Sequence, residues 1–192
     1  MRHRFGRLRR RLMKTAEKVA SLISQKNIVA IYQGRSEAGP RALGNRSLLY
    51  DPRDKFAKDF VNKIKKRESY RPFAASIMKE HANLWFDMCG LDESPFMMYA
   101  VDARPEVYDI IPGVLHVDKT CRIQTVTKQQ NYHYYKLIEL FYNITSVPLL
   151  FNTSFNLAGE TIVETIDDAI DTMKRCDVKY LYLPTSDELC IF

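Results

Sequence analysis

Four stretches of the chain carry apolar residues at the spacing of an amphipathic helix. In the first stretch Ala16, Val19 and Ile23 fall on one helical face. The last stretch opens with Thr165 and Asp168, which stand at the spacing of a capping box. The pattern predicts helices over Met13–Lys26, around Phe56–Ile64, around Tyr134–Phe141 and over Thr165–Arg175.

Short runs of apolar and β-branched residues lie between these helices and predict buried strands. The helices and strands alternate along the chain without an internal repeat or a low-complexity linker. This alternation predicts a single α/β domain over residues 15–192. The predicted strands are Asn27–Tyr32, Phe73–Met78, Phe96–Val101, Arg122–Val126, Val147–Phe151 and Lys179–Leu183.

The net charge of +6 suggests an acidic partner such as a nucleic acid, but most of the excess lies at one end. Seven basic residues precede the first acidic residue, Glu17, and the remaining chain has 22 basic against 23 acidic residues. We expect residues 1–14 to form a flexible basic arm, solvated or in contact with RNA or an acidic partner. The nearly neutral body argues against nucleic acid as the main partner.

The four cysteines are scattered and form no CxxC pair, which indicates reduced thiols and a cytoplasmic location. The sequence contains no apolar run of the ~18 residues that a membrane-spanning helix requires.

A glycine-punctuated loop at Gly34–Ser47 has the glycine spacing of a phosphate-binding P-loop. It lacks the lysine of that motif, because Asn45 follows Gly44. Arginines in the loop can still bind phosphate or carboxylate oxygens in pairs. The alternative is a surface loop whose arginines pair with nearby carboxylates.

A basic segment follows the second predicted helix. If the chain becomes extended after Lys63, Lys65 and Arg67 point to one face and can hold a phosphate between them. If the helix continues, the two side chains diverge and remain solvated charges. Arg71 adds a further cation to this segment.

A polar cluster begins where the apolar strand around Phe151 ends. Ligands of α/β sheets bind at the carboxyl ends of strands, which favours a binding site there. The alternative is a turn, because asparagine and serine are common turn residues. The cluster consists of Asn152, Thr153, Ser154 and Asn156.

Arg122 and Gln124 occupy alternate positions of one predicted strand, with His116 and Asp118 upstream. The other histidines are dispersed, so we expect His116 to be structural and expect no metal site in the chain. A tyrosine cluster at residues 132–135 could stack on bases, but its helical spacing favours core packing.

Together these segments resemble the C-terminal domain of the NodU/CmcH-type O-carbamoyltransferases. The resemblance covers about Glu17–Leu183 and rests on "EAGPRALGNRSLL", "NKIKKRESYRPFAAS", "VDKTCRIQTV" and "PLLFNTSFNLAGETIV". It implies a YrdC-like fold, a twisted mixed β-sheet with flanking helices. That fold is marked by a Lys-x-Arg pair and a Ser-x-Asn pair, which match Lys65 with Arg67 and Ser154 with Asn156.

The resemblance also implies a reaction. Such domains bind ATP and carbamoyl phosphate, with Mg²⁺ arriving on the nucleotide, and form a carbamoyl-adenylate. A separate actin-like N-terminal domain then passes the carbamoyl group to a hydroxyl acceptor. A non-catalytic YrdC-like module that binds RNA or regulates a partner is the alternative.

Residue roles follow from the same resemblance, with no metal ligand among them. The residues assigned to catalysis are Lys65, Arg71, Arg122 and Ser154. The residues assigned to binding ATP or carbamoyl phosphate are Arg41, Arg46, Arg67, Asn152, Thr153 and Asn156.

Overall fold

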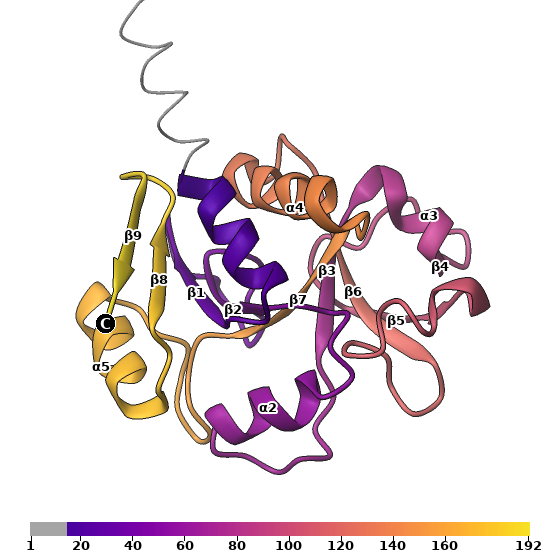
Figure 1. The fold of residues 1–192 in the computed structure, drawn as a ribbon. Helices are drawn as coiled ribbons and strands as arrows, with labels where there is room; N and C mark the ends of the chain where they lie inside the picture. Colours follow the sequence, from indigo (N-terminus) through magenta and orange to yellow (C-terminus); the bar gives the residue numbers. More distant parts are fainter. Residues whose placement is uncertain (1–14) are drawn as a thin grey trace, which may run out of the picture.

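A computed structural model describes residues 15–192, and the predicted basic arm at residues 1–14 lies outside them. The described chain forms a nine-stranded sheet in the order β4-β5-β6-β3-β7-β2-β1-β8-β9 (Figure 1). Two neighbouring pairs, β1 with β8 and β3 with β6, are parallel and the others are antiparallel. The sheet is therefore mixed, as expected. The strands are β1 Val29–Tyr32, β2 Arg46–Tyr50, β3 Ala74–Met78, β4 Phe86–Asp87, β5 Tyr99–Ala103, β6 Thr120–Val126, β7 Leu149–Ser154, β8 Tyr180–Leu183 and β9 Glu188–Ile191.

Helices cover both faces of this sheet, and all four predicted helices form. Residues 15–24 are helical and precede β1. The capping box of the last helix is present, since Asp168 N–H donates to the Thr165 hydroxyl and the Thr165 N–H to the Asp168 carboxylate. The labelled helices are α2 Ala57–Ile64, α3 Ala82–Trp85, α4 Tyr132–Thr145 and α5 Ile166–Cys176, with 3₁₀ turns at Lys79–His81 and Pro105–Val107.

Side-chain alternation along β7 separates the two faces. Phe151 packs against Tyr50 and Phe73, and the Tyr50 ring lies 5.0 Å from that of Phe60 on α2. The neighbouring residue Asn152 points to the opposite face, which α4 also covers. Figure 1 accordingly draws α2 and α4 on opposite sides of the central strands.

The strand pattern differs from the sequence prediction in several places, and the short strand β4 and the last strand β9 were not predicted. The predicted strand Phe96–Val101 begins three residues later, as β5 at Tyr99. The central strand β2 was not predicted, because its first residue, Arg46, seemed by composition to belong to the basic loop. All five residues of β2 are buried, so Arg46 lies in the sheet and not in the loop.

In the described range, 15–192, no helix combines the length and apolar character needed to cross a bilayer.

Candidate functional site

The basic segment after α2 is a helix end and not the extended segment that would place Lys65 and Arg67 on one face. Lys66 adopts a left-handed conformation with φ of 53°. The Lys66 N–H donates to Lys63 O, and the Arg67 N–H donates to Asn62 O. These two bonds form a Schellman cap, in which one left-handed residue closes the helix. The cap separates Lys65 from Arg67 by direction, so the two side chains have different neighbours.

Lys65 points into the protein and meets the polar cluster after β7. Its side chain is only 2% exposed, and its Nζ donates to Asn156 O and Asn156 Oδ1, each at 2.9 Å, and to Ser154 O. The Ser154 hydroxyl donates to Asn156 Oδ1 at 2.7 Å. The Lys-x-Arg and Ser-x-Asn pairs thus meet through Lys65. Burial, with repulsion from Arg67, lowers the pKa of Lys65 to about 7.

The Arg67 side chain is anchored through its Nε atom. Nε donates to Asn62 Oδ1 at 2.6 Å, and the guanidinium carbon lies 4.4 Å from the centre of the Phe73 ring. Within residues 15–192, Asn62 is the acceptor that this side chain uses, so the two terminal nitrogens remain for a ligand. Burial and the charges of Arg71 and Arg122 lower the pKa of Arg67 to about 10, against a weaker opposing effect of Glu68.

Arg122 continues this basic region across the sheet. Its cross-strand neighbour is Ala74, whose own neighbour on β7 is Asn152. The small side chain of Ala74 leaves room between Arg122 and Asn152. Burial and the charge of Arg41 lower the pKa of Arg122, and among the described residues its buried Nε has no hydrogen-bond partner.

The basic region is poor in compensating carboxylates. Arg71 pairs with Glu68 at 2.7 Å, but both side chains are about half exposed. Such an exposed pair is weak and can exchange for a stronger anion. Arg41, Arg67, Arg71 and Arg122 therefore form a cluster of like charges, here called the arginine cluster, and such a cluster suits phosphate oxygens.

The side chain of Asn152, on β7, is hydrogen-bonded to the main chain of the glycine-punctuated loop. Its side chain is 1% exposed and donates to Ala42 O at 3.0 Å and to Ser76 Oγ at 2.9 Å. Gln124 donates to Leu43 O at 2.9 Å beside it. The side-chain nitrogen of Asn152 is thus occupied by the fold, whereas its buried Oδ1 has no hydrogen-bond partner among the described residues. Thr153, on the next position of β7, points to the other face.

Arg46 is also occupied by the fold. Its guanidinium donates to Gln33 O at 2.6 Å and Asn45 O at 3.1 Å, and also to the main-chain carbonyls of Gly34 and Glu164. It lies 3.5 Å from the Tyr32 ring centre and is 2% exposed. We therefore leave Arg46, Asn152 and Thr153 out of the set that we propose to touch a ligand.

Two anchors of the site were not singled out from the sequence. Glu37 Oε1 accepts the N–H groups of Leu43 at 2.7 Å and Asn45 at 2.9 Å, which fixes the loop that carries Arg41. Asn62 orients Arg67 from within α2. Nothing local marks either residue, because each acts on a partner five or more positions away along the chain.

His116 has a structural environment, as expected. Its ring nitrogens lie 2.9 Å from Thr120 Oγ1 and 3.2 Å from Phe73 O. In the part of the chain that the structure describes, no three metal-binding side chains come together. Tyr134 is fully buried, which places it in the core.

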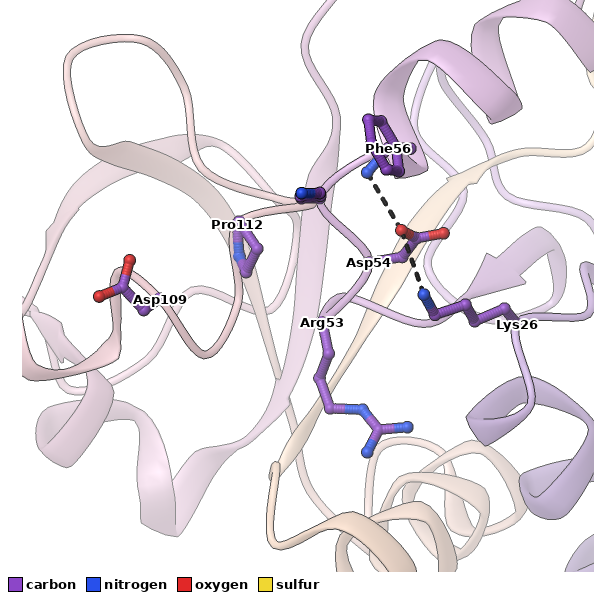
Figure 2. Close-up of a pocket in the computed structure, with 7 residues that line it drawn as sticks. Lys26, Arg53, Asp54, Phe56, Asp109 and Pro112 are labelled. Atoms are coloured by element: carbon purple, nitrogen blue, oxygen red, sulfur yellow. Dashed lines mark hydrogen bonds and ion pairs between the residues drawn. The ribbon is translucent and has the colours of Figure 1, made fainter.

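A separate cavity of about 370 Å³ lies near the start of α2, at the opposite end of that helix from Lys65 (Figure 2). Figure 2 shows Lys26 and the Phe56 N–H both directed at Asp54, at 3.5 Å and 3.1 Å. Arg53 pairs with the buried Asp51 at 2.6 Å. Since these two cations have carboxylate partners, this cavity is a poorer anion site than the arginine cluster.

Sequence comparison places residues 20–186 in the family described as "Carbamoyltransferase C-terminus". The chain is 45% identical over 165 residues to the nodulation protein NolNO of Sinorhizobium fredii, covering 85% of this chain and 24% of that protein. It is 44% identical over 165 residues to NolO of Bradyrhizobium diazoefficiens, covering 85% of this chain and 30% of that protein. The matched segment therefore spans only 24–30% of the length of these relatives.

Solved structures share the fold at low sequence identity. Full-length HypF in its phosphate- and nucleotide-bound form matches 84% of this chain and 20% of its own, with a TM-score of 0.56 and 19% identity. A variant of Sua5 from P. abyssi matches 82% of this chain and 45% of its own, with a TM-score of 0.54 and 17% identity. The YrdC-like fold is confirmed.

Proposed function

The chain belongs to the family of C-terminal domains of NodU-type carbamoyltransferases, and from this premise we propose that it makes an activated carbamoyl group. In the proposed reaction it binds ATP and carbamoyl phosphate and forms a carbamoyl-adenylate. The activated group then passes to a hydroxyl acceptor.

The arginine cluster is the observation that carries this proposal. In addition to burial, the charges of Arg71 and Arg122 lower the pKa of Arg67, and the charge of Arg41 lowers the pKa of Arg122. Because like charges destabilise a fold unless something binds between them, such a cluster indicates a polyanionic ligand. The bound phosphate and nucleotide of the HypF structure are consistent with a polyphosphate ligand on this fold.

The chemistry follows from the charges that develop. Hydrolysis of carbamoyl phosphate releases phosphate and leaves carbamate. A carbamate oxygen attacks the α-phosphorus of ATP, the bond from that phosphorus to the bridging oxygen breaks, and pyrophosphate leaves. Arg67, Arg71 and Arg122 stabilise the charge on the phosphoryl oxygens, and Arg41 binds the phosphate or carbamate end.

Ser154, Asn156 and Lys65 lie beside this cluster and complete the proposed site. Ser154 and Asn156 orient the nucleotide phosphates or the carbamoyl group. Mg²⁺ brought with the nucleotide would neutralise part of the phosphate charge, and no carboxylate of this chain is assigned to hold it. The arginine cluster suits the outer oxygens of that complex.

We further propose that this chain works with an actin-like domain. The relatives are three to four times longer than the segment that they share with it, since that segment is 24–30% of their length. In this proposal the additional domain binds the acceptor and completes the transfer. The present chain supplies the activated carbamoyl group.

The test is an assay for pyrophosphate. The chain is incubated with ATP labelled in the γ-phosphate, with and without carbamoyl phosphate. We expect labelled pyrophosphate only when carbamoyl phosphate is present, and we expect Arg122→Gln to abolish it. Binding of ATP without any pyrophosphate under these conditions would contradict adenylate formation and leave a nucleotide-binding module.

A further inference from the structure

The three protons of the Lys65 ammonium group all have partners within the protein. They are directed to Ser154 O, Asn156 O and Asn156 Oδ1, and a fourth oxygen, Ser154 Oγ, lies at 3.4 Å. An ammonium group has three donors and no acceptor, so this arrangement uses its whole capacity. With 2% of its surface exposed, Lys65 has no donor left for a ligand.

We propose that Lys65 is a positioning residue for the reaction, holding the turn at residues 154–158 in its binding shape while the arginine cluster contacts the ligand. The inference rests on the proposed function for the identity of the ligand. The role in the turn rests on the geometry alone. In this proposal the two residues of the Lys-x-Arg pair have different roles: the buried Lys65 orders the turn, and Arg67 contacts the ligand.

The turn needs a cation at its centre. Two main-chain carbonyls and an amide oxygen point at one place, and these partial negative charges repel one another when nothing lies between them. The Lys65 ammonium fills that place as a bound metal ion would. The main chain of Lys65 adds a second tie, because the Ala158 N–H donates to Lys65 O at 3.1 Å.

The order in this turn extends to the side chains that the reaction uses. Asn156 Oδ1 accepts from both Lys65 and Ser154, while Asn156 Nδ2 donates to Glu160 O at 2.7 Å. Removal of the ammonium group leaves Asn156 O and Ser154 O without this donor and removes one of the contacts that hold the Asn156 side chain. The Ser154 hydroxyl then donates to a less constrained partner.

The neighbours of Lys65 provide matched controls. The oxygens around the Lys65 ammonium, Ser154 O, Asn156 O and Asn156 Oδ1, are here called the cage. Lys63 is exposed in the last turn of α2 and does not contact the cage. Arg67 binds Asn62 through Nε and keeps its terminal nitrogens for a ligand. At pH 6, below the lowered pKa of Lys65, the three variants Lys65→Met, Lys63→Met and Arg67→Gln each remove one positive charge, so a general loss of charge affects them equally.

The experiment measures two quantities for each full-length variant. The first is the dissociation constant for inorganic pyrophosphate, and the second is amide hydrogen exchange in the segment 154–158. We expect Lys65→Met to weaken pyrophosphate binding and speed exchange, each by about tenfold or more, because buried oxygens lose their donors. Arg67→Gln should weaken binding without changing exchange, and Lys63→Met should change neither.

A rescue experiment tests the cage itself. Lys65→Ala leaves the oxygens facing a small space, which ammonium or methylammonium can enter and tetramethylammonium cannot. Recovery of slow exchange with the small cations at equal ionic strength supports the cage. Equal effects of all three salts, or no effect of any, would mean that the oxygens need no cation.

Two outcomes overturn the positioning role. If Lys65→Met weakens pyrophosphate binding while exchange stays slow, Lys65 contacts the ligand directly. If the variants do not fold, NMR of the Lys65 ammonium in the unaltered chain decides: the couplings of Nζ across its hydrogen bonds to the three carbonyl carbons should persist when pyrophosphate binds, and their loss refutes the proposal. If the unaltered chain binds neither pyrophosphate nor ATP, the proposed function fails. Fast amide exchange in Lys65→Met would then show that Lys65 orders the turn at residues 154–158 but has no role in ligand binding.

Discussion

Asn152 and Ala42 are joined by a 3.0 Å hydrogen bond that spans 110 positions of the chain. The donor is a side-chain amide on the central strand β7, and the acceptor is a main-chain carbonyl of the glycine-punctuated loop. Arg41 immediately precedes that carbonyl. The largely buried strand thus fixes the place from which the Arg41 side chain extends, which limits the entropy lost when a ligand binds.

We expect Asn152→Leu to destabilise the fold and to weaken anion binding together. The leucine leaves Ala42 O without its side-chain donor, so the free energy of unfolding should fall by about 1–3 kcal/mol. The loop then moves, and Arg41 no longer adds to the cluster. Urea unfolding and pyrophosphate titration measure the two effects. Asn143→Leu, at an exposed position of α4, is the control and should alter neither.

Gly44 should not accept a side chain. A Cβ atom there would lie 2.2 Å from Tyr134 Cδ1, and its φ of +102° disfavours other residues. We expect Gly44→Ala to lower the free energy of unfolding by at least about 2 kcal/mol, through overpacking and backbone strain together. Gly90→Ala has φ of +80° and no heavy atom within 4 Å, so it should show the strain alone. If the two variants lose the same free energy of unfolding, the contact with Tyr134 does not contribute to the destabilisation of Gly44→Ala.

The sequence predicted much of the fold because periodicity and caps act over a few residues. The helices α2, α4 and α5, and the strands β3, β6 and β8, follow from local patterns. Strand β2 did not, since the signal of a central strand is burial on both faces, and Arg46 at its start hides it. The two terminal nitrogens of its guanidinium donate to carbonyls that only the tertiary structure brings near.

The site shows the same limit. The types of residue and their order indicated an anion site, but side-chain directions depend on backbone conformation. The left-handed Lys66 turns Lys65 inward and Arg67 away from it, where alternation along a strand would have placed both on one face. Lysine rarely adopts this conformation, so local sequence could not predict it.

Arg122→Gln should lose ligand affinity without losing stability. A charge-assisted hydrogen bond contributes about 1.5–3 kcal/mol, so we expect pyrophosphate affinity to fall by at least about tenfold. The repulsion from Arg41 disappears at the same time, so the midpoint of urea unfolding should stay or rise.

Arg104→Gln serves as the control, because Arg104 is exposed and its Nε donates to Asn83 O at 2.9 Å. A destabilised Arg122→Gln protein with full affinity would assign Arg122 to the fold.

Anion affinity should depend on pH through Lys65. Its pKa is lowered to about 7 by burial and by Arg67, while the facing Cys176 thiol has its own pKa raised by burial and stays neutral. The three oxygens of the cage require the protonated form. Affinity for sulfate, whose charge is constant in this range, should therefore be complete below pH 7 and should fall as pH rises through that value.

The sign of this effect follows from linkage. Since the bound form prefers protonated Lys65, binding raises the pKa of Lys65 and takes up a proton near neutral pH. Calorimetry in two buffers with different ionisation enthalpies measures that uptake directly. The Lys65→Met variant should take up no proton on binding, and its sulfate affinity should not depend on pH. The Lys63→Met variant should retain both the proton uptake and the pH dependence of the unaltered chain. A wild-type protein that binds sulfate equally at low and high pH would show that Lys65 stays charged throughout, and the cage would then hold the turn without acting as a pH-sensitive element.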